Sequence, residues 1–228
     1  KEKLVLLAKS LVERNGAELD ALSFLVDAQL SNQEFLEAEN TLRQITFQHP
    51  TDAKHHFLLA RILAEKEGKE GEVIKLLDQA ASNLSFSAYI LAYKTNFLIK
   101  HKNYQQALSV IEEIDRSYPK LIVGMILKGD LHSSKKEYQQ AMKAYKNAYQ
   151  IKPSVNVLDA MLKVLTIQKK SKEAIALLED ELMKNKEATQ IKLRLAEFYQ
   201  NMGRYDSAAK NYKELLVKQK DNVILLNN

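Results

Sequence analysis

The chain of 228 residues is 46% hydrophobic and 28% charged, with only six Gly, three Pro and no Cys. So few helix-breaking residues predict long helices with short turns, and the absence of Cys excludes disulfides, thiolate metal ligands and a cysteine nucleophile. A net charge of +5 favours acidic partners or nucleic acid, but the 34 basic residues are interspersed with 29 acidic ones, which is typical of solvated helix faces.

A repeat with a period of about 34 residues runs along the chain. Pro119 and Pro153 are 34 residues apart, and Pro50 lies 69 residues before Pro119, which is one period of 34 plus one of 35. Fifteen residues before each proline stands an aromatic residue, followed three positions later by an alanine. These pairs are Phe35 and Ala38, Tyr104 and Ala107, and Tyr138 and Ala141, and the pattern recurs at Tyr205 and Ala208. Such a period predicts a stack of antiparallel helix pairs.

In chain order, the predicted elements are one half repeat and six complete helix pairs. Residues 1–18 are interpreted as the second helix of an earlier repeat. The complete repeats are expected at 19–52, 53–87, 88–121, 122–154, 155–188 and 189–222, and residues 223–228 begin a further helix. The whole of 1–228 is therefore expected to form a single array. Because it does not begin with methionine and stops within a helical pattern, we interpret it as part of a longer protein.

Two kinds of local signal accompany the repeat. Small residues mark the positions where paired helices approach most closely. They are Ala60, Gly129 and Ala196 on first helices, and Ala38, Ala107, Ala141, Ala174 and Ala208 on second helices. Two Ser-x-x-Glu sequences have the spacing of a capping box, which predicts side-chain caps for two second helices. They are Ser31 with Glu34, and Ser134 with Glu137.

The last complete repeat shows the pattern most fully. It carries Leu195, Ala196 and Tyr199 on its first helix, Gly203 at the turn, and Tyr205, Ala208, Tyr212 and Leu215 on its second helix. This pattern resembles the tetratricopeptide repeat, and its recurrence extends the resemblance over nearly the whole chain. The resemblance implies an all-α fold, an α-solenoid in which about six helix-turn-helix repeats form a right-handed superhelix, and a role in binding other proteins.

No group of residues indicates catalysis. The five histidines, His49, His55, His56, His101 and His132, have no metal-ligand spacing and no accompanying carboxylate cluster. His132 takes a core aromatic position of the repeat, so we expect a half-buried packing group. Residues 68–71 follow a predicted helix and lack the remaining residues of a phosphate-binding loop. We therefore predict no catalytic, cofactor-binding or metal site, and no enzyme activity.

Polar residues recur at the ninth position of each repeat, within an otherwise apolar first helix. The occupants are Asp27, Arg61, Asn96, Asp130, Lys163 and Glu197. First helices line the concave face of such an array, so we expect a polar stripe along a groove. Tyrosines on the same face favour binding to another protein. The predicted partner-binding residues are Lys54, Arg61, Tyr89, Tyr93, Asn96 and Asp130. The alternative is that each of them is an ordinary exposed residue of a helix face.

Two lysines lie where the family prefers leucine. Lys94 and Lys128 are one repeat apart. A buried lysine is costly unless it is paired or reaches water. Either the helices rotate slightly so that the amines reach solvent, or the pair faces the groove and meets an acidic ligand.

Residues 22–50 and 199–228 resemble long bacterial tetratricopeptide lipoproteins associated with exosortase and exopolysaccharide export, of the PEP-CTERM type. That resemblance implies a scaffold in the Gram-negative periplasm or anchored to the outer membrane. The residues themselves leave the compartment open, with the cytoplasm as an alternative, because a targeting or lipidation site would lie outside the chain. The longest apolar run, residues 121–127, is shorter than the roughly 18 residues of a membrane span.

The main functional hypothesis is a non-catalytic scaffold that holds an extended segment or a helix of a partner protein in its groove. An RNA-binding helical repeat is the alternative, motivated by the positive net charge. Repeats that read RNA need basic residues along one face, and Asp27, Asp130 and Glu197 in the polar stripe do not fit that requirement.

Apolar residues at both ends predict weak end-to-end self-association. An array without polar end repeats exposes the face that is meant for its neighbour. The residues concerned are Leu4, Leu7, Leu11 and Val12 near the N-terminus, and residues 223–226 near the C-terminus.

Overall fold

The computed structural model describes residues 2–82, 87–185 and 188–218, and in these ranges it contains thirteen α-helices and no strand. The helices are α1 (Glu2–Asn15), α2 (Leu19–Ser31), α3 (Phe35–Gln48), α4 (Ala53–Leu63), α5 (Glu70–Ala81), α6 (Ser87–Lys100), α7 (Tyr104–Ser117), α8 (Val123–Ser134), α9 (Tyr138–Ile151), α10 (Val155–Ile167), α11 (Ser171–Lys184), α12 (Thr189–Asn201) and α13 (Tyr205–Lys218). The predicted all-α fold is confirmed.

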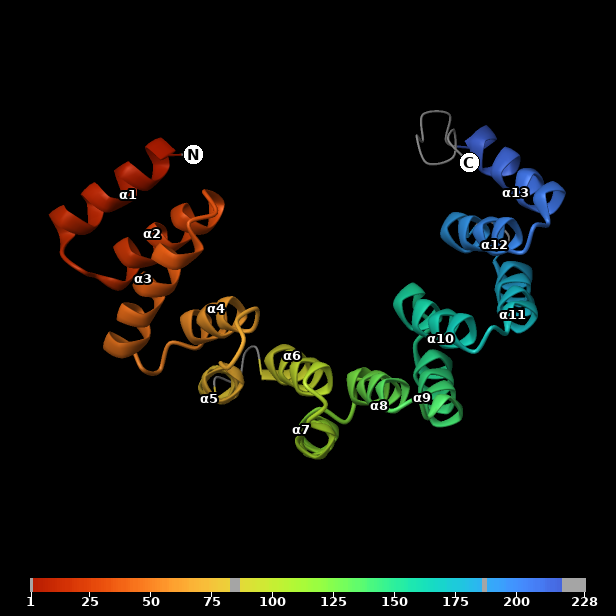
Figure 1. The fold of residues 1–228 in the computed structure, drawn as a ribbon, viewed down its shortest axis with the longest axis horizontal. Coiled ribbons are helices and arrows are strands. Elements are labelled where there is room, and N and C mark those ends of the chain that lie inside the picture. The colour runs from red at the N-terminus through yellow and green to blue at the C-terminus, as the bar shows by residue number, and fades with distance from the viewer. Residues whose placement is uncertain (1, 83–86, 186–187, 219–228) are drawn as a thin grey trace. The chain divides into compact units, whose positions relative to one another are not determined.

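Most helices that are consecutive in the sequence pack against one another. Contacts join α4 with α5, α6 with α7 and α12 with α13, and they also join one pair to the next, as between α3 and α4 or α11 and α12. Figure 1 shows one such pair in α12 and α13, which lie next to each other and are joined by a short turn. This packing is typical of an α-solenoid, in which each repeat buries its apolar face on its neighbours. From α2 onward the first helix of each pair begins at the first residue of an expected repeat. The exceptions are α6 and α8, whose first residues differ from the expected repeat starts by one position.

Two compact units make up the chain, and we call residues 1–127 the N-terminal unit and residues 128–228 the C-terminal unit. The core of the N-terminal unit includes Leu22, Leu42, Ile45, Leu59 and Leu77. The core of the C-terminal unit includes Leu158, Leu178, Leu195, Tyr199 and Leu215. The arrangement of all repeats as a single right-handed array stays a prediction.

The turn inside each of the six repeats contains one residue in the left-handed backbone conformation. A residue with positive φ lies two positions before each second helix. These residues are Gln33 (65°), Gly68 (72°), Lys102 (58°), Lys136 (63°), Lys169 (58°) and Gly203 (72°). Glycine adopts this left-handed conformation freely, whereas a side chain there is strained by roughly 1–2 kcal/mol. In the four repeats that have Gln or Lys at this position, the geometry of the turn therefore outweighs the backbone preference of the residue.

The predicted capping boxes are wrong. Ser31 and Ser134 are the last residues of α2 and α8, and Glu34 and Glu137 directly precede α3 and α9 without making a side-chain cap. The tight turn leaves too few residues for the box, because the chain passes from one helix to the next within three residues. Side-chain caps occur instead on first helices. Asp52 accepts a hydrogen bond from the backbone N–H of His55 at 3.1 Å, and the Ser154 hydroxyl accepts one from Val157 at 3.4 Å.

Small residues do lie where helices approach closely, as predicted. Ala38, Ala60, Ala107, Ala141, Ala174 and Ala196 are fully buried, and Ala208 is nearly so. Gly129 on α8 packs against the ring of Tyr145 on α9, and a Cβ atom at this position would overlap that ring. Tyr145 is itself buried, so it has little room to yield.

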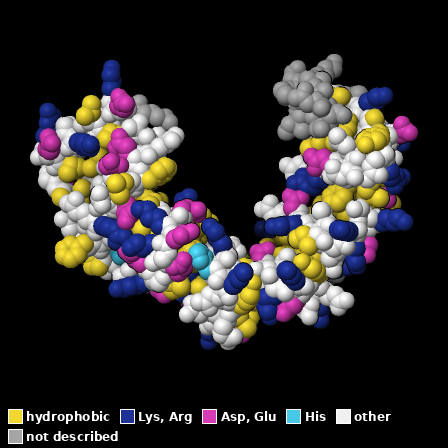
Figure 2. All heavy atoms as spheres, in the orientation of Figure 1, with side chains coloured by type: hydrophobic (Ala, Val, Ile, Leu, Met, Phe, Trp, Pro, Cys, Tyr) yellow, Lys and Arg dark blue, Asp and Glu magenta, His cyan; other side chains and the backbone are white. Residues whose placement is uncertain are grey.

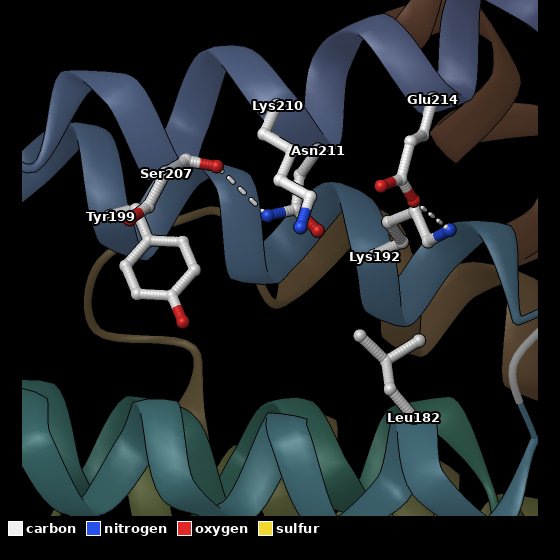
Figure 3. Close-up of a pocket in the computed structure, with 7 residues that line it drawn as sticks. All are labelled: Leu182, Lys192, Tyr199, Ser207, Lys210, Asn211 and Glu214. Atoms are coloured by element: carbon white, nitrogen blue, oxygen red, sulfur yellow. Dashed lines mark hydrogen bonds and ion pairs between the residues drawn. The ribbon is translucent and has the colours of Figure 1, made fainter.

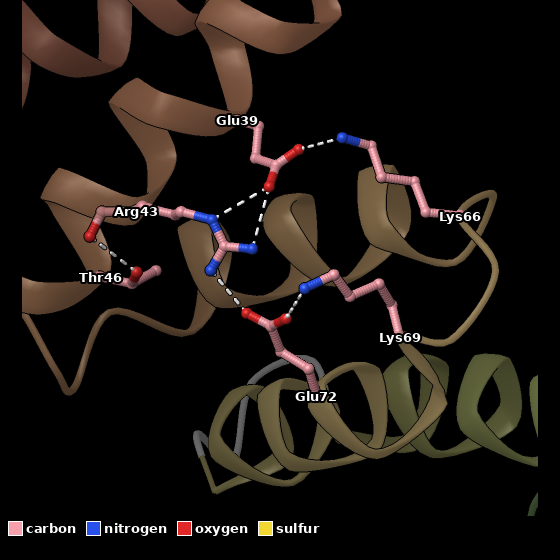
Figure 4. Close-up of polar contacts among 6 residues, drawn as sticks. All are labelled: Glu39, Arg43, Thr46, Lys66, Lys69 and Glu72. Atoms are coloured by element: carbon pink, nitrogen blue, oxygen red, sulfur yellow. Dashed lines mark hydrogen bonds and ion pairs between the residues drawn. The ribbon is translucent and has the colours of Figure 1, made fainter.

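Ion pairs connect successive helices of the N-terminal unit (Figure 4). Glu39 on α3 accepts hydrogen bonds from Arg43 and from Lys66, which lies in the turn after α4. Arg43 also reaches Glu72 on α5, with Nη1 at 2.5 Å from Oε1, and Lys69 lies 3.2 Å from the other oxygen of Glu72. The hydrogen bond from Arg43 lowers the pKa of Glu72. Burial alone would raise the pKa of Glu39, but its bonds to Lys66 and Arg43 outweigh burial and lower it.

In the C-terminal unit tyrosine hydroxyls make several of the links between helices, beside ion pairs such as Arg194 with Asp159. Tyr145 Oη donates to Asp130 Oδ1 at 2.6 Å, and Tyr149 Oη donates to Glu181 Oε2 at 2.6 Å. Tyr199 makes a similar bond to Glu179. Each bond satisfies a carboxylate without adding a positive charge.

Within the described part of the chain, none of the helices combines the length and apolar character needed to span a membrane. Leu4 and Leu7 of α1 are exposed, whereas Leu11 and Val12 are half-buried. Residues 223–226 lie outside the described residues. End-to-end self-association stays a prediction.

Candidate functional site

Three aromatic rings meet on the surface of the N-terminal unit. Phe57 of α4 lies between Tyr89 and Tyr93 of α6, with ring centroids 5.6 Å and 5.2 Å apart and nearly perpendicular planes. Edge-to-face pairs of this kind add about 0.5–1.5 kcal/mol beyond the area that they bury. The guanidinium of Arg61 lies over the Phe57 ring at 5.9 Å from its centroid. We call Phe57, Arg61, Tyr89 and Tyr93 the aromatic cluster.

The cluster forms because of spacing on two adjacent helices. Phe57 and Arg61 are four residues apart on α4, and Tyr89 and Tyr93 are four apart on α6, so each pair lies on one helix face. Contact between α5 and α6 and between α4 and α5 brings the two faces into register. Phe57 was not among the predicted site residues. Its four-residue spacing from Arg61 was the signal that could have identified it.

A hollow of about 710 Å³ lies beside the cluster. Its lining comes from four helices and one turn and consists of Leu30, Phe35, Leu58, Arg61, Ile62, Glu65, Lys66 and Tyr93. Most of these side chains are apolar or aromatic. Phe35 is 56% exposed and Tyr89 is 62% exposed, so large rings stand in solvent at this face. Exposed apolar surface gathered around a hollow is typical of a binding site.

Charges around the hollow are balanced except at Arg61. Lys66 is bonded to Glu39, and Glu65 lies 3.8 Å from Lys100. Among the described residues, the guanidinium of Arg61 has no ion-pair partner. Its positive charge opposes the effect of burial on Tyr93, but burial is stronger and the pKa of Tyr93 is raised. The hollow is thus a mostly apolar depression with one cation at its rim, Arg61, that is unpaired among the described residues.

The predicted site residues fall into three groups. Arg61, Tyr89 and Tyr93 belong to the aromatic cluster. Lys54 and Asn96 are exposed on α4 and α6 but do not line the hollow. Asp130 belongs to the C-terminal unit, where it is half-buried and accepts the hydrogen bond from Tyr145. Burial raises the pKa of Asp130, and the bond from Tyr145 and the charge of Lys163 offset only part of that effect. The partner-binding role of these residues stays a prediction.

Two of the histidines for which no metal site was predicted, His55 and His56, are buried in the N-terminal unit. His55 lies between two polar side chains, with Nε2 at 3.0 Å from Ser23 Oγ and Nδ1 at 3.0 Å from Asp52 Oδ2. The order of these groups resembles a hydrolase triad. However, the Ser23 hydroxyl donates to the Leu19 carbonyl at 2.6 Å, and His55 is only 3% exposed. A substrate cannot reach the imidazole, so we assign the arrangement to packing between α2 and α4.

Other polar residues also have structural partners. The Lys94 side chain is largely buried, but its Nζ lies 2.5 Å from Oδ1 of the exposed Asp78 of α5, so a carboxylate of the chain itself pairs with the amine at the surface. His132 is half-buried, as predicted, and its Nδ1 lies 2.7 Å from Glu137 Oε2. Within the described residues, no group of three or more His, Cys, Asp or Glu is placed to hold a metal ion.

A smaller hollow in the C-terminal unit, of about 420 Å³, is lined mainly by polar side chains (Figure 3). Lys192 Nζ lies 2.7 Å from Glu214 Oε2, and Asn211 donates to the Ser207 carbonyl at 2.9 Å. These groups satisfy one another, and none of the predicted site residues is present. The aromatic cluster with its hollow is therefore the stronger candidate site.

Comparison with known proteins identifies the repeat. Three family models of the tetratricopeptide repeat match residues 25–88, 124–155 and 165–225. A search of curated proteins found no match.

Several solved structures have a similar fold. A tetratricopeptide repeat protein from Parabacteroides merdae is 12% identical, with a TM-score of 0.67 over 96% of this chain and 87% of that one. Pseudomonas aeruginosa pilF is 18% identical, with a TM-score of 0.56 over 91% and 95%. A human IFIT1 dimer with m7Gppp-AAAA is 15% identical, with a TM-score of 0.55 over 96% and 55%. At these identities the likeness concerns the fold alone.

Proposed function

The chain belongs to the tetratricopeptide repeat family, and on that premise we propose that it is a non-catalytic scaffold that holds a segment of a partner protein against its aromatic cluster. The observation that carries the proposal is the exposure of aromatic rings beside a mostly apolar hollow with one cation at the rim, Arg61, that is unpaired within the described part of the chain. Proteins of this family commonly bind other proteins, which supports the class of function but not the particular surface.

The chemistry of the cluster suggests what the partner presents. A bulky apolar side chain would fill the hollow, because its lining is mostly apolar. A carboxylate next to that side chain would meet Arg61, whose planar guanidinium can bind both carboxylate oxygens. Tyr89 and Tyr93 would supply contact area at low entropic cost and are of the type that dominates binding energy at protein interfaces.

Substitution of exposed cluster residues tests the proposal. Peptides that bind the 228-residue chain would be selected from a displayed random library. They would then be titrated with the parent and with the double variant Arg61→Ala/Tyr89→Ala, and affinity would be measured by fluorescence anisotropy. We expect a loss of affinity of about tenfold or more, since truncated interface anchors each cost roughly 1–2 kcal/mol or more. Both residues are exposed, so circular dichroism should show an unchanged helix content.

Asn96→Ala is the matched control, because Asn96 is exposed on α6 but does not line the hollow. This control distinguishes a binding site centred on the hollow from a binding site that follows the polar stripe at the ninth position of each repeat. A less than twofold change is expected for Asn96→Ala. Selected peptides that bind the double variant as tightly as the parent would contradict the proposed site.

Placement in a Gram-negative envelope, within an exopolysaccharide export system, is a narrower proposal. It is supported by the sequence resemblance of residues 22–50 and 199–228 to bacterial lipoproteins of that kind. Fractionation of the native organism, followed by immunoblotting for this chain, tests it. Recovery in the cytoplasmic fraction would overturn it.

RNA binding is the second candidate, and the C-terminal unit is the reason to keep it. That unit has 19 Lys and Arg against 12 Asp and Glu. The human IFIT1 structure, which shares the fold, is described with m7Gppp-AAAA. Titration with single-stranded RNA at low and physiological salt would test it, because RNA binding through phosphates weakens steeply as salt rises. Tight, steeply salt-dependent binding would favour this candidate.

A further inference from the structure

The positive charge of the chain belongs entirely to one unit. The N-terminal unit has 15 Lys and Arg against 17 Asp and Glu, whereas the C-terminal unit has 19 against 12. Within the C-terminal unit, residues 138–158 contain no acidic residue and include Lys143, Lys146 and Lys152. This stretch covers all of α9 and the start of α10. A helix that carries cations and no carboxylate cannot neutralise its own charge.

A hollow of about 560 Å³ lies along α9, between this helix and the start of α11. Its cations are Lys143, Lys146 and Lys170, and its amides include Asn147, Gln150 and Gln168. We call this hollow the basic groove. Lys143 and Lys146 are both exposed and stand three residues apart, which places them on one side of α9.

The charges of the groove do not cancel. Glu173 is the acidic residue of its lining, and it is paired with Lys170, whose Nζ lies 2.9 Å from Glu173 Oε1. In the described part of the chain, no carboxylate pairs with Lys143 or Lys146. The groove therefore presents two unneutralised ammonium groups beside a row of amides that can donate and accept hydrogen bonds.

We propose that the basic groove is a second docking surface, which binds an acidic peptide segment of a partner protein. Charge complementarity identifies the occupant, since carboxylates would neutralise Lys143 and Lys146 while the amides bond to the peptide backbone. This surface is separate from the aromatic cluster, and the proposal does not depend on that site.

The groove fits an acidic peptide better than a nucleic acid. Its cations are all lysines, which act as flexible point charges, whereas arginine is preferred where phosphates and bases are recognised in fixed geometry. Tyr138 is the aromatic residue of its lining, and it is half-buried. Single-stranded nucleic acids need exposed rings on which successive bases stack. RNA is accordingly the alternative outcome of the test.

The C-terminal unit offers a closely matched control. Lys210 and Lys213 on α13 occupy the same positions after Tyr205 that Lys143 and Lys146 occupy after Tyr138. All four lysines are exposed. The α13 pair, however, has Asp206 and Glu214 on the same helix. Removing either pair changes the net charge equally, so only a site-specific effect can distinguish them.

The test is a fluorescence anisotropy titration of the 228-residue chain with a labelled peptide of alternating Glu and Ser, and in parallel with labelled oligouridine. We expect saturable binding of the acidic peptide that weakens about fivefold in Lys143→Gln/Lys146→Gln, as for the loss of two solvent-exposed ion pairs. Lys210→Gln/Lys213→Gln should change the affinity less than twofold. Arg61→Ala/Tyr89→Ala should leave this binding unchanged, which separates the two proposed surfaces.

Three results would overturn the proposal: no saturable binding of the acidic peptide, equal loss in both lysine pairs, or tighter binding of oligouridine that also depends on Lys143 and Lys146. Equal loss would mean attraction by net charge alone. Circular dichroism of both double variants checks that helix content is retained, and since all four lysines are exposed, no change is expected.

Discussion

The two units share one fold but differ in how some of their buried and half-buried carboxylates are satisfied. In the N-terminal unit, Glu39 and Glu72 are bonded to Arg43 and to lysines. In the C-terminal unit, Asp130 and Glu181 accept hydrogen bonds from tyrosine hydroxyls, although Glu181 also pairs with Lys184. Ion pairs between helices occur there too, as between Arg194 and Asp159. Helix packing is therefore set by the repeat, whereas the polar links between helices are free to vary from one repeat to another.

This difference affects both surface charge and pKa. The acidic and basic residues of the N-terminal unit nearly balance, and Figure 2 shows both kinds of side chain intermixed over its face. In the C-terminal unit the phenols bring no positive charge to the carboxylates that they satisfy. The pKa of Glu39 is lowered by its cationic partners, whereas burial raises the pKa of Asp130. The same fold thus carries carboxylates with opposite contributions to stability.

The largest effect is expected where the units are alike, in their apolar cores. Leu77 and Leu178 are both fully buried, one in each unit. Replacing either with Ala should lower the free energy of unfolding by about 2–5 kcal/mol, because a cavity adds to the lost transfer energy. Urea unfolding followed by circular dichroism measures the change. A loss below about 1 kcal/mol for only one of them would break the equivalence of the two cores.

Two glycines should respond in opposite directions to the same substitution. Gly129→Ala would place a methyl group against the buried ring of Tyr145, so we expect a loss of about 1–3 kcal/mol. Gly71 lies in α5 with nothing near its Cβ position, so Gly71→Ala should stabilise by up to about 1 kcal/mol. Thermal unfolding compares the variants. A stable Gly129→Ala variant would mean that the two helices can move apart freely.

Neutralising one carboxylate in each unit tests whether the charge of Glu39 stabilises the fold and the charge of Asp130 does not. Glu39→Gln leaves Arg43 and Lys66 without their shared partner and should cost about 1 kcal/mol at neutral pH, since both cations are partly exposed. Asp130→Asn removes a charge that burial disfavours and keeps an oxygen that can accept from Tyr145. We expect it to be neutral or stabilising. Urea unfolding midpoints at neutral pH measure both changes. A larger loss of stability for Asp130→Asn than for Glu39→Gln would contradict the expectation that the charge of Asp130 is unfavourable.

The smallest effect concerns pH. The lowered pKa of Glu39 means that its contribution is present above the ordinary value of 4.5 and is lost as pH falls through the lowered pKa. The raised pKa of Asp130 acts oppositely, because its contribution is present below 3.8 and is lost as pH rises through the raised pKa. On acidification Glu39→Gln should therefore lose less stability than the parent, and Asp130→Asn should lose more. Urea titrations across the acidic range test both signs, and identical slopes for all three proteins would refute them.

The sequence by itself determined the helices and their pairing. Pro50, Pro119 and Pro153 each lie two residues after the end of a second helix, at α3, α7 and α9. Proline has no backbone N–H and disfavours helical geometry in the residue before it, so the end of each helix is encoded locally. The repeated spacing then carries the register through the repeats that lack a proline. Family, fold class and the small buried residues follow from that register.

Only the tertiary structure decided which side chains meet. Phe57 contacts Tyr93, His55 contacts Ser23 and Lys94 contacts Asp78, and each of these pairs joins different helices. The register gives the helix face on which a residue lies, but the angle and offset at which two helices pack decide which residues on those faces come within contact distance. The prediction of capping boxes was wrong for a similar reason. The packing of paired helices requires one residue of each turn to take the left-handed conformation, whichever residue type occupies that position.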